Sequence, residues 1–224
     1  MGLMAKNNEG PEREPIPEGL YLGVCYLIAD LGTHTDERWN KDIRKVQIGW
    51  EIPELPPIEY QDKDTGERIS RPQAVWKRYT LSLHEKAALR KHLESWRGKA
   101  FTQDELYGFD LQKVLGASCQ LQIIHNTSDK SGKVYANVAN VIQVPKGTTA
   151  VEVKNELQWF SFDELLSGQV SEITPGIPEW MQNVIKESHE WDRFTGDDMP
   201  VDEPHGGLDE EGNVKDEPDS SMPF

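Results

Sequence analysis

The stretch that decides the fold is AVWKRYTLSLHEKAALRKHLESWRG, residues 74–98, because its apolar pattern changes from the period of a strand to that of a helix. Alternation over 74–81 predicts a strand. Ser82-x-x-Glu85 is a capping box, whose side chains accept the free backbone N–H groups at a helix start. The helix is therefore expected to run from this box to Gly98. Apolar residues at helical spacing form its buried stripe: Leu89, Leu93 and Trp96.

Working outward, alternation predicts two strands before this stretch, at 20–29 and 43–52, and two after it, at 119–124 and 134–144. A Pro-rich, charged connection fills 53–72. The order is three strands, a helix and two strands. The OB-fold has this order: it is a mainly β, five-stranded Greek-key barrel with a helix between strands 3 and 4. Other small β-barrels with an inserted helix fit the same order.

The remaining pieces are short. A second capping box, Thr102-x-x-Glu105, and the segment 110–115 predict short helical turns. Beyond Lys146 a strand is expected within 151–160 and a helix after Ser161-x-x-Glu164. A further helix over 178–187 has an apolar face of Ile177, Trp180, Met181, Val184 and Ile185. We expect four parts: a flexible arm at 1–17, the OB-fold domain at 18–150, a C-terminal extension at 151–195 and a disordered acidic tail at 196–224.

The extension at 151–195 is too short to form a core of its own. It is expected to pack on the barrel or on a second copy of the chain. Both a monomer and a homo-oligomer therefore remain open.

Charge is distributed unevenly along the chain. The net charge of −15 by itself argues against nucleic acid as a partner. Residues 19–150, however, carry 18 basic and 16 acidic side chains, whereas residues 196–224 carry 1 and 10. The central domain is thus slightly basic, and the acid is concentrated at the C-terminal end. Such asymmetry is typical of an interaction tail.

The sequence lacks the patterns of several protein classes. No apolar run approaches the roughly 20 residues of a membrane helix, and residues 1–17 lack the apolar stretch of a signal peptide. Cys25 and Cys119 lie far apart in strand-like segments and are expected to be free, buried thiols. There is no P-loop, no G-x-G-x-x-G and no Cys/His zinc spacing. No catalytic residue, metal or cofactor is therefore expected.

Basic side chains interleave with aromatic ones at three places where OB-folds bind nucleic acid: the first loop, the strand 2–3 face and the last hairpin. Single strands are held by cations along the backbone and by rings on which bases stack. Trp50 and Tyr79 share faces with apolar residues and are expected in the core, whereas Trp76 and Tyr135 are expected to be exposed. The candidate nucleic-acid residues are Trp39, Lys41, Arg44, Lys45, Gln47, Arg71, Trp76, Lys77, Arg78, Lys130, Lys133 and Tyr135.

The chain ends in DEPDSSMPF, residues 216–224. An apolar tip on an acidic tail is of no use as a solubilising device, but a partner protein can hold the Phe224 ring in a pocket while cations contact the acids. The tail is also a polyanion tethered near a basic domain, so we expect it to compete with DNA in cis. The predicted partner-binding residues are Asp216, Glu217, Asp219, Met222, Pro223 and Phe224.

Several stretches resemble segments of phage single-stranded DNA-binding proteins with an OB-fold and an acidic tail. They are KVQIGWEI (45–52), YTLSLHEKAALR (79–90), LESWRGK (93–99), FTQDEL (101–106) and YANV (135–138). The tip is similar to the Pro-Phe ending of bacterial single-stranded DNA-binding proteins, although Ser-Ser-Met stands where acids and an aliphatic residue are common. The resemblance implies sequence-independent binding in DNA replication, recombination or repair, no catalytic activity, partners recruited through the tail, and the host bacterial cytoplasm as the location.

Two alternatives remain open from the sequence. The first is an OB-fold interaction module that binds a protein partner and no DNA. The second is a replication nuclease whose active site has no recognisable motif, since catalytic groups need not be close in sequence.

Overall fold

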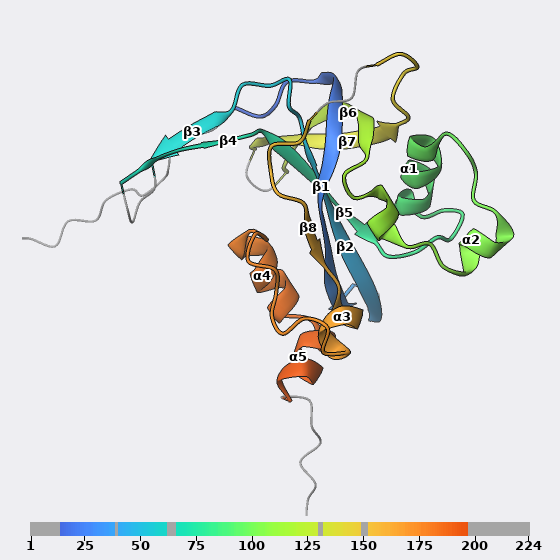
Figure 1. The fold of residues 1–224 in the computed structure, drawn as a ribbon. Coiled ribbons are helices and arrows are strands. Elements are labelled where there is room, and N and C mark those ends of the chain that lie inside the picture. The colour runs from blue at the N-terminus through green and yellow to red at the C-terminus, as the bar shows by residue number, and fades with distance from the viewer. Residues whose placement is uncertain (1–13, 39, 62–65, 130–131, 149–151, 197–224) are drawn as a thin grey trace, which may run out of the picture.

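The long first strand organises the architecture (Figure 1). In the computed structural model, β1 (Gly19–Asp36) pairs antiparallel with β2 (Lys41–Glu51) along one edge. On the other edge its first part pairs with β6 (Ser118–Thr127), and Leu27–Ala29 pair in parallel with β8 (Gln158–Phe160). With β5 (Ala74–Thr80) next to β2 and β7 (Val134–Ile142) next to β6, the strand order is β5-β2-β1-β6-β7, with β8 beside β1.

The structure describes residues 14–38, 40–61, 66–129, 132–148 and 152–196. Outside the main sheet, β3 and β4 form a two-stranded hairpin that projects from the rest of the molecule (Figure 1). The bounds of these further elements are β3 (Ile58–Gln61), β4 (Arg68–Arg71), α1 (Ala88–Arg97), α2 (Gln103–Tyr107), the 3-10 helix η1 (Leu111–Val114), α3 (Phe162–Leu166), α4 (Glu179–Lys186) and α5 (His189–Thr195).

The mainly β class is confirmed, but a closed five-stranded barrel is not. The two ends of the main strand path are β5 and β7, and no strand pairing joins them in the described part of the chain. The ammonium of Lys77 on β5 instead donates to the Val138 carbonyl of β7 at 2.5 Å. The Lys77 side chain therefore lies in the seam between β5 and β7, where a closed barrel would have backbone hydrogen bonds between the two strands.

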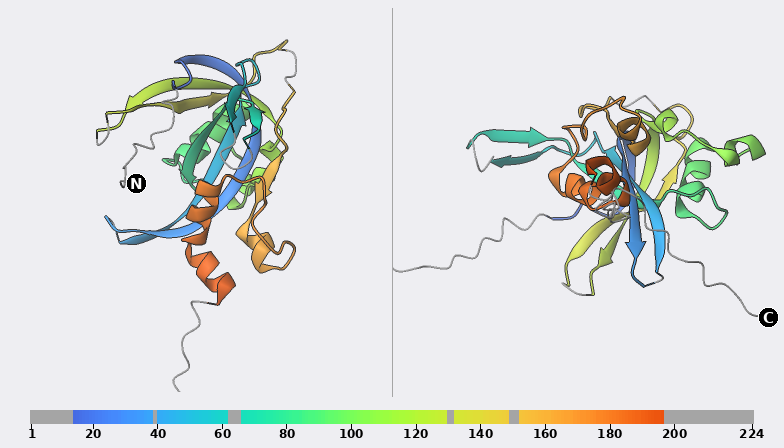
Figure 2. Two further views of the ribbon diagram at one scale, coloured as in Figure 1. Left: turned by 90° about the vertical axis from the view of Figure 1, so that its left-hand side faces the viewer. Right: turned by 90° about the horizontal axis from the view of Figure 1, so that it is seen from below.

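Apolar side chains pack on both faces of β1, which explains its unbroken buried run from Val24 to Leu31. On one face, residues of β2, β5, β6, β7 and α1 form the larger core around Trp50, which is 1% exposed. On the other face, β8 and α3–α5 supply a second core around Met181 and Phe160. Figure 2 shows these C-terminal helices, in orange, gathered beside the long blue strands. The segment 152–196 thus packs on the sheet of its own chain.

One predicted helix start is wrong. Helix α1 begins at Ala88, and its N-cap, Ala87, makes no side-chain capping bond. The Ser82 hydroxyl instead accepts from the His84 backbone N–H at 3.2 Å, because serine forms such local turns as readily as it caps a helix. The predicted stop is confirmed, since Gly98 adopts the left-handed conformation at the C-cap (φ 67°). The buried stripe Leu89, Leu93 and Trp96 and the Thr102–Glu105 capping box are confirmed as well.

The connection predicted over 53–72 contains the β3–β4 hairpin, which the sequence did not indicate. Each strand has only four residues, too few for alternation to be recognised. Cys25 and Cys119 are free and fully buried, as predicted. Burial raises the pKa of both thiols, so both remain protonated.

Two carboxylates attach the C-terminal extension to the sheet. Glu51 of β2 is completely buried and accepts the backbone N–H groups of Lys154 and Asn155. Glu190 of α5 accepts the backbone N–H of Thr33 at 2.6 Å and its hydroxyl at 2.7 Å. Burial would raise the pKa of Glu190, but the bonds from Thr33 outweigh it and the pKa is lowered. The extension is therefore held by specific polar contacts as well as by its apolar core.

Candidate nucleic-acid interface

The pairing of β2 with β5 arranges the outward side chains in rows. Successive residues of a strand point to opposite faces, so the residues between Val46, Ile48 and Trp50 lie on the second face of the sheet, on which the C-terminal extension packs. Residues directly opposite each other lie on the same face. The pairs on this second face are Lys45 with Thr80, Gln47 with Arg78, and Gly49 with Trp76. Gln47, a predicted nucleic-acid residue, is only 4% exposed there.

Trp76 is fixed on this face by three contacts. A Cβ atom on Gly49 would lie 2.6 Å from Trp76 Cδ1, so the ring fits only because residue 49 is glycine. The indole Nε1–H donates to the hydroxyl of Tyr26 at 2.9 Å. Burial raises the pKa of Tyr26 to about 12, so this hydroxyl stays neutral at physiological pH. The third contact is Trp180, and Trp76 remains 40% exposed.

Trp180 comes from the C-terminal extension and stands against Trp76. The two ring centroids are 6.5 Å apart and the ring planes meet at 78°. Met181 and Ile185 on the buried side of α4 anchor the helix, which leaves Trp180 45% exposed. We call this pair of half-exposed rings the tryptophan corner. Sequence reasoning placed Trp180 on an apolar helix face and missed it as a site residue.

Four of the predicted cations lie on β2, β4 and β5, at increasing distances from the tryptophan corner. Arg78 is exposed two residues from Trp76, and its Nε donates to the buried Gln47 at 3.4 Å. Lys45 and Lys41 continue the outward row along β2, half-buried and exposed respectively. Arg71 is exposed at the end of β4. Flat rings and cations are the groups that single-strand binding uses, and Arg78, Lys45 and Lys41 share the face of Trp76.

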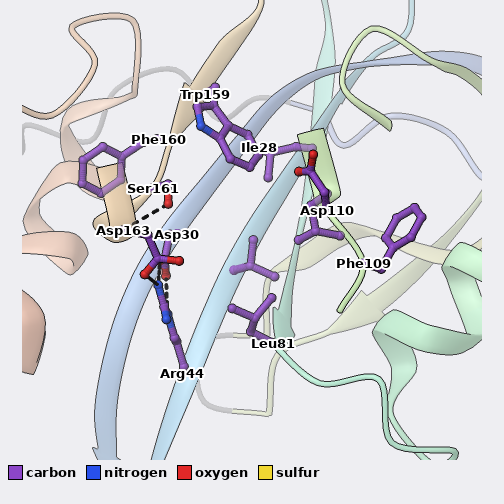
Figure 3. Close-up of a pocket in the computed structure, with 12 residues that line it drawn as sticks. Ile28, Asp30, Arg44, Leu81, Phe109, Asp110, Trp159, Phe160, Ser161 and Asp163 are labelled. Atoms are coloured by element: carbon purple, nitrogen blue, oxygen red, sulfur yellow. Dashed lines mark hydrogen bonds and ion pairs between the residues drawn. The ribbon is translucent and has the colours of Figure 1, made fainter. Parts of the chain in front are cut away.

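Two other predicted cations point elsewhere. The Arg44 guanidinium donates to Asp30 at 2.5 Å and to Asp163 at 3.2 Å inside a cavity of about 220 Å³ (Figure 3). The hydrogen bond with Asp30 raises the pKa of Arg44 further above its usual range. The Lys77 ammonium lies in the seam to β7, where burial lowers its pKa. The structure does not bring these two side chains to the face of the tryptophan corner.

The last hairpin supplies the rest of the predicted residues. Tyr135 on β7 is 53% exposed opposite Asn126, and Lys133 is exposed just before it. The Lys77 bond places β7 beside β5, so Tyr135 is on the strand next to that of Trp76 and Lys133 directly precedes that strand. The predicted exposure of Trp76 and Tyr135 and the predicted burial of Trp50 and Tyr79 are confirmed. Outside the described residues lie Trp39, Lys130 and the tail residues Asp216, Glu217, Asp219, Met222, Pro223 and Phe224.

Two other features, a metal site and a membrane-spanning helix, are absent from the described residues. In the part of the chain that the structure describes, no three His, Cys, Asp or Glu side chains are grouped so as to hold a metal ion. Across the same residues, no helix has the length and apolar character needed to span a bilayer.

Comparison with known proteins adds no identification. No protein-family model matches the chain, and neither the curated proteins nor the solved structures give a match.

Proposed function

We propose that this protein binds single-stranded DNA without sequence preference and acts in phage DNA replication, recombination or repair. The observation that carries the proposal is the tryptophan corner beside Arg78. Two half-exposed indoles meet there: Gly49 and the Tyr26 hydroxyl hold Trp76, and the buried side of α4 holds Trp180 against it. The exposed guanidinium of Arg78, two residues from Trp76, provides positive charge. Exposed tryptophans fixed in this way are more than the fold requires, and each is a surface on which a base stacks.

We propose further that the main sheet is an OB-fold with an open seam. In the chain, β1, β2 and β5 come first and lie side by side in the sheet. Helix α1 follows, and β6 and β7 then pair on the other edge of β1, which gives the order β5-β2-β1-β6-β7. This is the strand and helix order of the OB-fold. Lys77 supports the proposal because it bonds β5 to β7 where the barrel would close. In an OB-fold, the face of the second and third strands is a common nucleic-acid surface. These strands correspond to β2 and β5 here, and Trp76 lies on β5.

The arrangement indicates how a strand would be held. The rings of Trp76 and Trp180 stack with bases, which every nucleotide offers, so binding does not depend on sequence. Lys41, Lys45 and Arg78 contact phosphates along the same face and release counterions. No bond is made or broken, and the proposed role is to coat and protect the strand.

Titration of the intrinsic tryptophan fluorescence with oligo-dT tests the proposal. We expect quenching as bases stack on Trp76 and Trp180, and tighter binding at lower salt. If Lys41, Lys45, Arg71 and Arg78 each contact one phosphate, the slope of log K against log salt should be about −2.8, at roughly −0.7 per contact on single strands. Absence of quenching and of a gel shift at low salt would leave the protein-interaction module as the better reading. Cleavage of labelled DNA that requires magnesium would favour the nuclease.

The acidic tail is proposed to recruit partner proteins and to compete with DNA. Deleting residues 197–224 keeps Gly196, which caps α5 in the left-handed conformation (φ 83°). A tethered tail has an effective concentration near 1 mM, so a tail affinity of about 100 µM for the DNA site implies roughly tenfold tighter oligo-dT binding after deletion. The measurement is the same fluorescence titration at low salt. Unchanged affinity would refute competition in cis and leave partner recruitment untouched.

A further inference from the structure

The cavity that contains the Arg44 guanidinium lies where the C-terminal extension meets the β1–β2 hairpin (Figure 3). Its volume is about 220 Å³. Much of its lining is apolar, because Ile28, Val46 and Phe160 line it and none of them is more than 2% exposed. Leu81 lines it as well and is 37% exposed. The described residues therefore leave an apolar surface uncovered in this cavity.

The polar part of the lining carries more negative than positive charge. Asp30, Asp110 and Asp163 line the cavity together with Arg44, so three carboxylates minus one guanidinium leave a net charge of −2. The guanidinium bonds Asp30 through two nitrogen atoms and Asp163 through one of them. Asp163 is nevertheless 81% exposed. Asp110 accepts the Gln112 backbone N–H at 2.8 Å and forms no ion pair with any described residue.

Charged groups around the cavity do not reverse this sign. Arg97 Cζ and Lys113 Nζ lie 4.8 and 5.8 Å from the centre of the Phe109 ring, which lines the cavity, but neither residue lines it itself. Glu105 forms an ion pair with Arg97 and so neutralises it. Glu164, which accepts an indole N–H of the lining at 2.9 Å, offsets Lys113. The cavity and its surroundings therefore favour a cation.

The lining selects among occupants. Across the described residues, no three His, Cys, Asp or Glu side chains are grouped so as to hold a metal ion. A phosphate would meet an excess of carboxylates. A neutral molecule would cover the apolar lining but shield the carboxylates from water without pairing them, which costs free energy. An organic cation satisfies both parts, because its charged end pairs with a carboxylate and its apolar body covers the exposed Leu81.

The placement of two carboxylates narrows the choice further. Asp163 at the start of α3 and Asp110 before η1 stand on opposite sides of the cavity, with Leu81 between them (Figure 3). A molecule with a cationic group at each end and an apolar middle is complementary to this arrangement, and its two charges match the net charge of the lining. The volume lies below the roughly 300–1,000 Å³ of sites for drug-sized ligands, so the occupant is small.

We propose that this cavity binds a small diamine, in which two ammonium groups are joined by a short apolar chain. One ammonium pairs with Asp110 and the other with Asp163, and the chain covers the apolar lining. The tryptophan corner shares no residue with the cavity: Val46 lines the cavity, whereas Gly49, which accommodates Trp76, lies on the opposite face of β2. The proposal therefore does not depend on nucleic-acid binding.

Nuclear magnetic resonance of the isotope-labelled full chain tests the site, with the five-carbon diamine cadaverine as the probe. The indole N–H resonance of Trp159, whose ring lines the cavity, should shift, and it is assigned by its loss in Trp159→Phe. The indole resonance of Trp76 should not move. Pentylamine has one ammonium and should bind about threefold more weakly than cadaverine, since an exposed ion pair contributes only modestly. Pentanediol has no charge and should bind more weakly still.

Asp110→Asn removes one of the two charges but keeps an oxygen that accepts the Gln112 N–H. It should weaken cadaverine binding about threefold. Asp163→Asn keeps an acceptor for Arg44 and should have an equal effect, so the double variant should lose about tenfold. The matched control is Asp104→Asn, an exposed acid of α2 that does not line the cavity. It removes the same charge and should change the affinity by less than about twofold.

Three results would overturn the diamine site. The first is a wild-type chain that binds pentylamine or pentanediol as tightly as cadaverine. The second is a loss of affinity in Asp104→Asn that equals the loss in Asp110→Asn, with circular dichroism showing that both variants are folded. The third is a shift of the Trp76 resonance in place of the Trp159 resonance.

Discussion

Replacing Trp76 with alanine is expected to weaken oligo-dT binding by about 5- to 150-fold, which corresponds to roughly 1–3 kcal/mol for one stacked base. Three contacts hold the indole in place: Gly49, the Tyr26 hydroxyl and Trp180. Because the ring is already fixed in the free protein, little side-chain entropy is lost when a base stacks on it. Fluorescence anisotropy of labelled oligo-dT measures the affinity without relying on the tryptophan that is removed.

Three further variants separate stacking from damage to the fold. Trp76→Phe keeps a ring but loses the hydrogen bond to Tyr26, so most of the affinity should remain. Gly49→Ala keeps the indole but puts a methyl group where the ring lies, so it should weaken binding in the same direction as Trp76→Ala. Phe194→Ala on α5 removes an aromatic ring with the same 40% exposure as Trp76, and it should have no effect on affinity. Equal losses for Phe194→Ala and Trp76→Ala would contradict the tryptophan corner as the binding site.

Much of the fold follows from local sequence pattern. Alternation located β2, β5, β6 and β7 within a few residues, because each has one face in the core. Strand β1 runs beyond the predicted 20–29 as far as Asp36, since its second half pairs with the start of β2 in a long hairpin. The parallel pairing of β8 with Leu27–Ala29 could not be predicted, because it joins segments more than 120 residues apart.

The site was harder to predict, because its members meet through long-range contacts. The sequence identified Trp76 by its position between apolar neighbours. It could not show that Trp180 stands against Trp76. Nor could it show that the Arg44 guanidinium bonds both Asp30 and Asp163, the latter 119 residues away in the chain. The strand pattern predicts a solvated side chain for Lys77, yet this side chain lies in the seam between β5 and β7. A pattern assigns a side chain to a face, but the partners on that face depend on tertiary packing.

Loss of the Glu51 side chain should destabilise the protein strongly. Its side chain is 0% exposed and accepts four hydrogen bonds from two residues that lead into the extension. Lys154 N–H bonds both carboxylate oxygens, at 2.9 and 3.1 Å, and Asn155 donates its backbone N–H at 2.8 Å and its side-chain amide at 2.6 Å. Hydrogen bonds to a charged group contribute about 1.5–3 kcal/mol each, and they are not additive within one cluster.

Glu51→Ala should therefore lower the free energy of unfolding by about 3 kcal/mol, since it leaves three donors of partly buried hydrogen bonds without their acceptor. Urea denaturation measures the change, and amide exchange at Lys154 and Asn155 should accelerate more than exchange in the core strands. The matched control is Glu54→Ala, three residues along, because Glu54 is exposed and accepts one bond, from the Leu22 N–H at 3.0 Å. It should cost no more than about 1 kcal/mol. Equal losses for the two variants would mean that Glu51 does not hold the extension on the sheet. If the Glu51 bonds do hold it, Glu51→Ala should also weaken oligo-dT binding, because α4 then no longer fixes Trp180 beside Trp76.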